Sequence, residues 1–517
     1  MTNSLLNFVT GYLGQFLITG LKFVTRTVFI STLGKSYLGI NGLFTDILKM
    51  LALTELGLDT AMNFRLYKPL AEKRDKDVRL LLKFYRQAYT VIGFVILGLG
   101  ILVIPLLPVL IKDYASLETL GINAVLVFVL HLLQSVSSYL FFAYRSCIIK
   151  ADQKSYILNT VDMGITVLTY ATEIVILIVW KDFIWYTASG IIFHILKNFI
   201  NAFIAQKMYP QYFIKEEDNL PKEEIKSMFK DCGALFIYKI NSVVVKATDN
   251  LILSTFLGLA MVALYSNYLM FYTTIRSFIS RFYTACKASM GNLFATSEVS
   301  RQYFFFEVMN FLSVVLFGTA CVGVGVVADE FILTWIGESY MIEQPFAILM
   351  GIEILLVGIK FNLSQVRQVS GAFRQMWMRP VLGIIINLVV SIALVNVWGI
   401  HGVLVGTIAA DVLANFMVDP RIIHKSVFKN YKPASDYYKK NLTYFGILAV
   451  IEIIDFVICK NFFVGFGWWS VIVHSCICAV SVVGTFLALY WNTEVTKYLW
   501  DKGLSILGKK FKKFRRA

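Results

Sequence analysis

The chain has 517 residues, of which 57% are hydrophobic and 16% are charged, and its mean hydropathy is +0.68. Soluble globular domains carry about 25% charged residues, so this composition excludes an ordinary soluble domain and favours a membrane protein. The net charge of +15 would suggest a nucleic-acid partner for a soluble chain, whereas membrane proteins concentrate Lys and Arg in their cytoplasmic loops.

Apolar segments long enough to cross a bilayer recur along the whole chain. Residues 91–111 read VIGFVILGLGILVIPLLPVLI, and about 20 such residues span a hydrocarbon core of about 30 Å. The pattern predicts an all-α polytopic protein with fourteen membrane spans, near residues 5–33, 37–66, 84–111, 119–149, 156–180, 183–208, 232–257, 259–290, 302–329, 345–373, 377–398, 400–419, 441–460 and 466–491.

Basic residues alternate between the loops of the two sides. Clusters such as Arg65 to Arg86, Lys197 to Lys230 and Lys360 to Arg379 fall on one side, whereas the opposite loops carry only Lys35, Lys112, Lys181 and Lys460. The positive-inside rule then predicts that both termini are cytoplasmic. The basic excess is explained by topology, so no nucleic-acid partner is expected.

The two halves of the chain repeat each other weakly. TLGKSYLGINGLF (32–44) and FLGLAMVALYSNY (256–268) share a Leu-Gly turn, and RSCIIKADQK (145–154) corresponds to RQVSGAFRQ (367–375) at a similar offset. Six spans per repeat give parallel repeats that suit alternating access around a central cavity. The predicted organisation is an N-terminal lobe at 1–214, a charged linker at 215–231, a C-terminal lobe at 232–430, two further spans within 431–492, and a basic tail at 493–517.

Several cations lie inside predicted spans, where an isolated Lys or Arg costs about 2.5–3.5 kcal/mol unless it faces a cavity or a partner. Lys22 and Arg26 share one helix face. When the two repeats are aligned with an offset of 224 residues, Lys22 corresponds to Lys246. The whole set predicts a cationic substrate cavity, because Lys and Arg bind phosphate oxygens well. Its members are Lys22, Arg26, Lys49, Lys239, Lys246 and Arg276.

A structural interpretation of the same cations stays open. Asp46 with Lys49 and Lys246 with Asp249 are spaced i, i+3, and Glu55 or Asp59 could neutralise Lys22 and Arg26 across the first hairpin. Buried acids are candidates for ion coupling, chiefly Asp249, Asp411 and Glu353. No metal site, cofactor or enzymatic centre is predicted, and H+, Na+ or the membrane potential could drive transport.

Two motifs resemble one known family. FISTLGKSYLGINGLFTDILKMLALTELGL (29–58) looks like the first-hairpin signature of the polysaccharide-transporter family, the lipid-linked oligosaccharide flippases of the MOP superfamily, and FILTWIGESY (331–340) resembles its outer motif after the ninth span. The resemblance implies a MOP fold with two lobes. It also implies that the six cations above engage the diphosphate and sugar of an undecaprenyl-diphosphate-linked oligosaccharide.

The function that this resemblance implies is flipping of that lipid to the outer leaflet of a bacterial plasma membrane for capsule or exopolysaccharide synthesis. Its expected partners are membrane lipids and, in the same pathway, a polysaccharide polymerase and glycosyltransferases. Other functions stay open at this point: a teichoic-acid or peptidoglycan precursor flippase, a multidrug exporter of the same superfamily, or a non-transporting scaffold for polysaccharide assembly.

Overall fold

The computed structural model describes the backbone of residues 2–52, 58–112, 114–214, 216–370 and 379–502. Within these ranges, the side chains of residues 2–13, 58–61, 64, 229–242, 246, 282 and 284–289 are not described. The chain forms two compact units, unit 1 (Met1–Ser266) and unit 2 (Asn267–Ala517). The boundary between them falls inside one helix, α12 (Leu259–Thr296).

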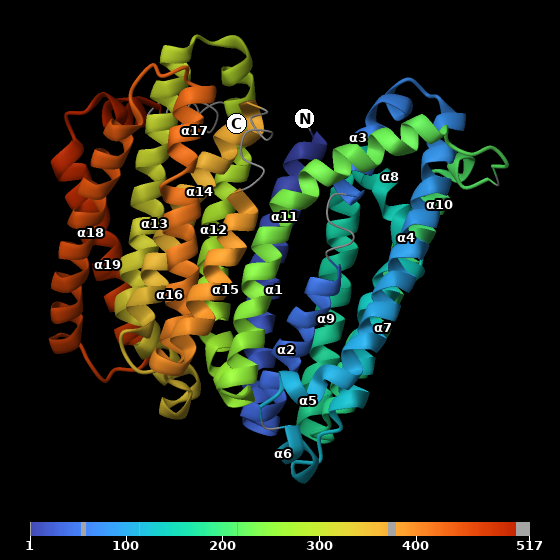
Figure 1. The fold of residues 1–517 in the computed structure, drawn as a ribbon, viewed down its shortest axis with the longest axis horizontal. Helices are drawn as coiled ribbons and strands as arrows, with labels where there is room; N and C mark the ends of the chain where they lie inside the picture. Colours follow the sequence, from blue (N-terminus) through green and yellow to red (C-terminus); the bar gives the residue numbers. More distant parts are fainter. Residues whose placement is uncertain (1, 53–57, 113, 215, 371–378, 503–517) are drawn as a thin grey trace, which may run out of the picture. The chain divides into compact units, whose positions relative to one another are not determined.

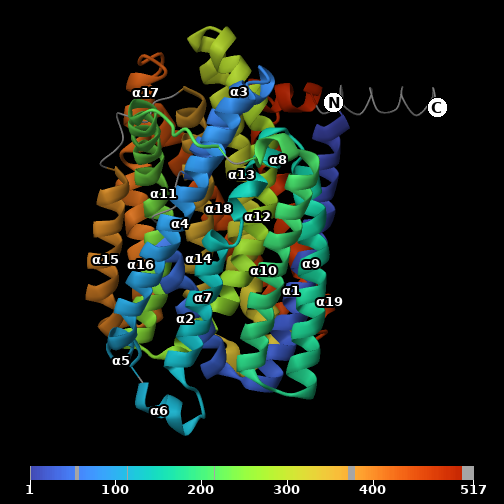
Figure 2. The same cartoon turned by 90° about the vertical axis from the view of Figure 1, so that its right-hand side faces the viewer.

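The secondary-structure elements of unit 1, within its described residues, are helices joined by short turns and loops (Figure 1). Its helices are α1 (Thr2–Leu33), α2 (Lys35–Leu51), α3 (Leu58–Ala71), α4 (Asp75–Val103), α5 (Leu107–Leu110), α6 (Tyr114–Thr119), α7 (Ala124–Leu140), α8 (Ser146–Ala151), α9 (Ser155–Val179), α10 (Phe183–Met208) and α11 (Lys222–Phe256). Figure 2 shows α3 and α8 at one end of this unit and α5 and α6 at the other.

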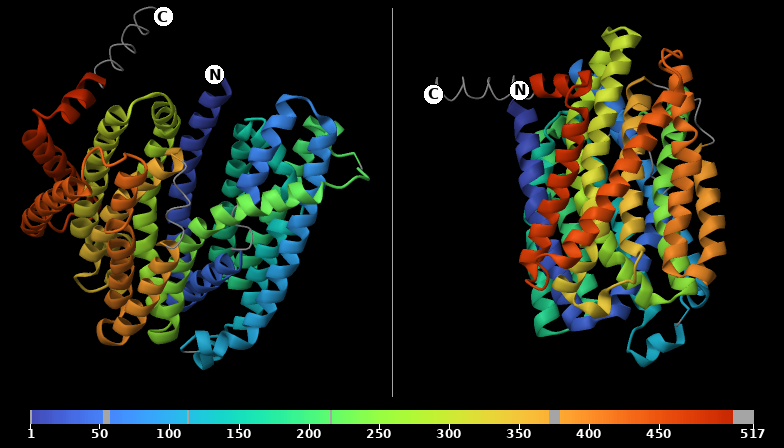
Figure 3. Two further views of the ribbon diagram at one scale, coloured as in Figure 1. Left: turned by 45° about the horizontal axis from the view of Figure 1, so that its top comes forward. Right: turned by 90° about the vertical axis from the view of Figure 1, so that its left-hand side faces the viewer.

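Unit 2 contains the rest of α12 and the later helices. These are α13 (Val299–Ile336), α14 (Phe346–Ser370), α15 (Arg379–Trp398), α16 (Ile400–Ala410), α17 (Asp419–Ser426), α18 (Ala434–Asn461) and α19 (Trp468–Tyr490), with a π-helix at Asp411–Phe416 between α16 and α17. In Figure 3, α18 and α19 form an outer pair at one edge of this unit.

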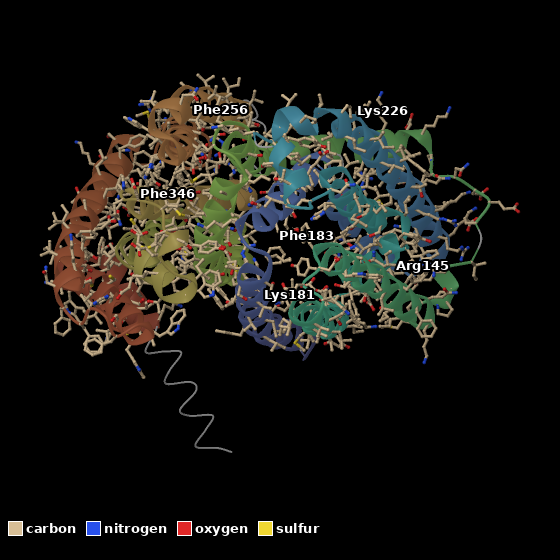
Figure 4. All side chains as sticks on the ribbon, turned by 90° about the horizontal axis from the view of Figure 1, so that it is seen from below. Arg145, Lys181, Phe183, Lys226, Phe256 and Phe346 are labelled. Atoms are coloured by element: carbon tan, nitrogen blue, oxygen red, sulfur yellow. The ribbon has the colours of Figure 1, made fainter. Side chains whose placement is uncertain are left out.

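Sequence signals explain several helix ends. Pro105 and Pro108 interrupt α4, which passes through a 3₁₀ turn at Ile104–Leu106 into α5. The Asn123 side chain accepts a hydrogen bond from the backbone of Leu126 and caps α7, and Asp182 caps α10 in the same way through Ile184 and Trp185. Figure 4 labels Phe183 at the start of α10, whose ring lies 5.8 Å from that of Phe29 in α1.

Ten helices of the described residues are long and apolar enough to cross a membrane, or eleven if α7 and α8 count as one bent span. The all-α polytopic prediction is therefore confirmed. The predicted spans 37–66, 232–257 and 259–290 coincide with α2, α11 and α12 without passing that test. α2 has only 17 residues, and the side chains of α11 and α12 are described only in part.

Two predicted spans are wrong as continuous helices. The span 37–66 ends at Leu51 in α2, and a separate helix, α3, begins at Leu58. The span 119–149 begins at Ala124, and after α7 the chain bends by 42° before α8. A long sequence window averages hydropathy over such breaks, so the break itself leaves no signal in the average.

The linker between the predicted lobes lies along α4 of unit 1. Arg79 Nε donates to Glu216 Oε2 at 2.8 Å, and Lys76 Nζ lies 2.6 Å from Asp218 Oδ2. Lys83 adds hydrogen bonds of 3.0 Å to the carbonyls of Glu217 and Asp218. We call residues 216–221 the linker strap. The next helix, α11, packs against α2, α3 and α5 and so belongs to unit 1, although the predicted C-terminal lobe begins at 232.

Glycine allows close helix packing in unit 2. A Cβ on Gly402 of α16 would lie 2.5 Å from the carbonyl oxygen of Leu394 in α15, and one on Gly406 would lie 3.0 Å from that of Asn387. Small residues four apart on a membrane helix let two backbones approach, as they do between α15 and α16.

Candidate functional site

Three of the predicted cations lie near one another in unit 1. Lys22 and Arg26 are one turn apart on α1, and Lys22 lies within electrostatic range of both Arg26 and Lys49 of α2. Arg26 Nη2 donates to Ser266 Oγ at 2.5 Å. In the described part of the chain, no carboxylate lies within 4.0 Å of the Lys22 ammonium. The first two helices therefore bring three basic side chains near one another.

One acid joins this cluster. Asp46 Oδ1 lies 2.7 Å from Lys49 Nζ, and Asp46 Oδ2 accepts a hydrogen bond from Asn250 of α11. The Lys49 side chain is 61% exposed in spite of this pair, so it can reorient. The structural interpretation of Lys49 thus holds for its ion pair. Among the described side chains of this cluster, three are basic and one is acidic.

The other predicted residues of unit 1 lie on α11. The side chains of Lys239 and Lys246 lie outside the described residues, as do Glu55 and Asp59, so their proposed pairings stay predictions. Asp249 is 2% exposed and accepts a hydrogen bond of 3.4 Å from the Tyr265 hydroxyl. Asp249 therefore lies in the packed interior with a phenol beside it.

A second group of predicted residues meets in unit 2. The fully buried hydroxyl of Tyr272 in α12 lies within electrostatic range of Glu353 in α14, of Arg276 and of Asp411. Glu353 and Asp411 are 8% and 6% exposed. Three residues predicted from different parts of the sequence thus surround one phenol.

Lys360 completes this second group, and the sequence analysis missed it. Lys360 Nζ lies 2.8 Å from Asp411 Oδ1, and the same carboxylate accepts a hydrogen bond from Asn415 in the π-helix. Lys360 was predicted to belong to a cytoplasmic loop cluster, and this prediction is wrong because Lys360 lies in the middle of α14. A lysine embedded in an apolar run signals a buried partner, but its partner is 51 residues away in the chain.

The two groups differ in what their charges allow. The unit 1 cluster (Lys22, Arg26, Lys49, Asp46) has an excess of cations and can bind an anion through charge-assisted hydrogen bonds. The unit 2 group (Arg276, Glu353, Lys360, Asp411) contains two basic and two acidic side chains, so its formal charges cancel. Its Asp411 carboxylate already holds an ammonium and an amide, so a metal cation would have to displace Lys360.

Comparison with known proteins gives the family. A model of the family described as "Polysaccharide biosynthesis protein" matches residues 5–286. The chain belongs to this family. A search of curated proteins finds no significant match.

Solved structures with the same fold are membrane transporters. The lipid II flippase MurJ in an inward closed conformation aligns with a TM-score of 0.64 and 15% identity, over 94% of this chain and 99% of MurJ. An inward-facing multidrug resistance MATE family transporter of the MOP superfamily aligns with a TM-score of 0.60 and 13% identity, over 80% of this chain and 96% of its own. The fold of this polysaccharide biosynthesis protein is therefore the MOP fold that the sequence predicted.

Proposed function

We propose that the protein is a flippase that moves an undecaprenyl-diphosphate-linked oligosaccharide from the inner to the outer leaflet of the bacterial plasma membrane. The observation that carries the proposal is the positive cluster of Lys22, Arg26 and Lys49 within the apolar helices of a polysaccharide biosynthesis protein. Such a cluster is costly in a membrane unless it binds an anion, and the diphosphate is the anion of this lipid.

The energetics favour outward movement. An inside-negative potential drives an anion outward by about 2.3 kcal/mol per charge per 100 mV. In the proposed cycle, α1 and α2 bind the diphosphate, the oligosaccharide shares the cavity, and the lipid tail stays in the membrane while access alternates. Both termini are placed in the cytoplasm. The membrane potential is the proposed driving force because Lys360 already neutralises Asp411.

The fold supports transport of this kind of molecule. MurJ, which shares the fold, is named as a lipid II flippase. We assign the oligosaccharide of a capsule or exopolysaccharide pathway as the cargo, with its polymerase and glycosyltransferases acting before and after flipping. The family description supports this choice over a peptidoglycan or teichoic-acid precursor.

The decisive experiment measures lipid-linked oligosaccharide in the inner leaflet of a deletion strain. The strain is complemented with the wild-type protein, with Lys22→Gln/Arg26→Gln, or with Lys207→Gln/Lys226→Gln. The last variant removes the same number of charges from exposed positions and serves as the control. We expect accumulation that the wild type and the control relieve and that the Lys22/Arg26 variant at equal abundance does not.

Each alternative function gives a different result. If the protein were a precursor flippase, the deletion strain would accumulate a lipid with a peptidoglycan or teichoic-acid headgroup. A multidrug exporter would confer drug resistance that the Lys22/Arg26 variant retains. A scaffold would give equal rescue by all three proteins, and this result would overturn the assignment of the cluster.

A further inference from the structure

Unsatisfied polar atoms gather where α13, α17 and α18 meet in unit 2. His424 Nε2, Tyr437 Oη, Asn310 Oδ1 and Asp419 Oδ1 are buried, and none has a hydrogen-bond partner in the described part of the chain. These four side chains are only 0–4% exposed. Buried polar atoms in native proteins are nearly always satisfied by protein or by ordered water, so this cluster requires an explanation.

The cluster is short of hydrogen-bond donors. His424 Nδ1 lies 2.7 Å from the carbonyl oxygen of Pro420, which can only accept, so in the neutral ring the proton is on Nδ1 and Nε2 is an acceptor. The Asn310 amide nitrogen donates to Asn441 at 3.2 Å, which leaves its oxygen as a second acceptor. These two acceptors face the Tyr437 hydroxyl, which offers only one hydrogen. Asp419 lies beside the guanidinium donors of Arg367 and Arg379 and is not counted here.

A cavity of about 70 Å³ is lined by two of these residues, Asn310 and Tyr437. Its lining residues are Tyr303, Phe306, Glu307, Asn310, Lys432, Asp436, Tyr437 and Lys440. One water in the liquid occupies about 30 Å³, so the cavity has room for about two. Each water brings two hydrogens, which supplies the missing donors.

The cavity lies between exposed lysines and the aromatic residues whose rings contact His424. At its mouth, Lys440 Nζ lies 3.0 Å and Lys432 Nζ 3.6 Å from the Glu307 carboxylate, and these lysine side chains are 38% and 46% exposed. On the inner side, the His424 ring lies 5.8 Å from the ring of Tyr437, which lines the cavity. One water between them can join the Tyr437 hydroxyl to Nε2.

We propose that ordered water in this cavity carries protons from the aqueous mouth to His424 and makes its Nε2 a buried proton-binding site. A hydrated proton gives up its hydrogen, an N–H bond forms at Nε2, and the ring gains one positive charge. The charged and titratable groups that face the ring or its cavity are Tyr303 and Glu307 of α13, Asp436, Tyr437 and Lys440 of α18, Lys432 before α18, and Asp419 of α17 itself. Burial disfavours the charged form of the ring, and the two acids on neighbouring elements, Asp436 and Glu307, partly offset this effect.

The first test is radiolytic footprinting of the full chain in lipid nanodiscs, in which hydroxyl radicals formed from bound water oxidise adjacent side chains. Tyr437 and Tyr444 form a matched pair on α18, since they are 4% and 1% exposed and only Tyr437 lines the cavity. We expect fast oxidation of Tyr437 and slow oxidation of Tyr444. The variant Asn310→Leu removes one hydrogen-bond acceptor and replaces it with an apolar side chain. In this variant, Tyr437 should be oxidised as slowly as Tyr444. Equal protection of both tyrosines in the wild type would overturn the proposal.

The second test follows the proton. The chain has five histidines, so ¹⁵N-histidine spectra can be assigned by single substitutions. His131 is the internal control, because its ring nitrogens lie 2.9 Å from the Val127 carbonyl and 3.0 Å from the Asn41 side-chain oxygen. We expect His424 Nε2 to take up a proton as the pH is lowered, and to do so more slowly in Asn310→Leu, while His131 stays unchanged. A His424 signal that behaves like that of His131 would reject proton access even where water is present.

Discussion

Lys360 and Asp411 form an ion pair in the interior of unit 2. Asp411 is 8% exposed at its side chain and Lys360 30%. Removing one member of a buried pair leaves a buried charge without compensation, which typically costs 3–5 kcal/mol, whereas removing both costs much less.

We therefore expect Lys360→Met to lower the free energy of unfolding by about 3 kcal/mol, and the double variant Lys360→Met/Asp411→Asn to recover most of that loss. The measurement is thermal unfolding in detergent, followed by tryptophan fluorescence, with a double-mutant cycle for the coupling. Lys76→Met is the control, since both members of its pair with Asp218 are 60% exposed and its loss should destabilise the protein far less. Equal losses in both lysine variants would contradict a buried ion pair.

At this scale the sequence predicted types of residue better than partners. The cations Lys22, Arg26 and Lys49 were found because charge stands out in apolar helices, and Asp46 was found as a neighbour i, i+3 of Lys49. Asn250, Ser266 and Lys360 were missed. Their contacts join distant parts of the chain, and such distances follow from tertiary packing rather than from local spacing.

Among the helices, the α15–α16 contact depends on the absence of side chains. We expect Gly402→Ala to destabilise unit 2 by about 1–3 kcal/mol, because the added methyl group would meet the Leu394 carbonyl at 2.5 Å. Gly484→Ala in α19 is the matched control, since no atom lies within 4 Å of the new methyl group. It should be neutral or stabilise by up to about 1 kcal/mol. Thermal unfolding of both variants measures the difference, and similar midpoints would refute the close contact.

The linker strap depends on pH. The hydrogen bond from Arg79 lowers the pKa of Glu216, and the bond from Lys76 lowers that of Asp218. Because these pKa values are lowered when the strap is bound to α4, the ionised carboxylates stabilise the bound strap above the pKa of a free carboxyl group, about 4. This stabilisation is lost as the pH falls through the lowered pKa values of the bound strap. A spin-labelled amino acid at position 219 should be immobile at pH 7 and become mobile well below pH 4.

The variant Glu216→Gln/Asp218→Asn should be mobile already at pH 7, because it lacks both carboxylates. Strong immobilisation of the label in that variant would show that the lysine bonds to backbone carbonyls suffice to hold the strap.

Helix prediction succeeded where apolar runs are long and bounded by charge or a capping residue, as in α10 behind Asp182. It failed at the end of α2 and at the bend after α7, where hydropathy averaged over a long window does not mark the break. The predicted repeat stays a prediction, since the corresponding arginines have different partners. Arg145 donates to Gln206 at 2.7 Å in unit 1, and Arg367 donates to Asp419 at 3.4 Å in unit 2, although residues 371–378 lie outside the described part.

At the scale of the molecule, α18 and α19 are predicted additions to twelve repeated helices, yet they provide partners for α13. Lys440 pairs with Glu307 at 3.0 Å, and His474 Nδ1 lies 2.6 Å from Glu330 Oε2. Without these helices, two acids and an apolar face of α13 would lose their cover. The pair is thus part of the packing of unit 2.

We expect a chain truncated after residue 431 to be unstable in the membrane, and coexpression of residues 432–517 as a separate fragment to restore it. Protein abundance and size-exclusion behaviour in detergent report the outcome. A truncated chain as abundant and monodisperse as the full one would show that α18 and α19 are dispensable for folding.

The π-helix at Asp411–Phe416 keeps two distant contacts in phase. Lys360 and Arg367 are seven residues apart on α14 and share a face, since seven residues return an α-helix to within about 20° of its starting direction. Their partners Asp411 and Asp419 are eight apart, which in a regular α-helix would leave them about 80° out of step. The wider π turn absorbs one residue, so eight residues behave as seven. The π turn thus behaves as a one-residue insertion that leaves Asp411 and Asp419 aligned with Lys360 and Arg367. Deleting one residue from the π turn would restore regular α-helical winding and keep both acids aligned.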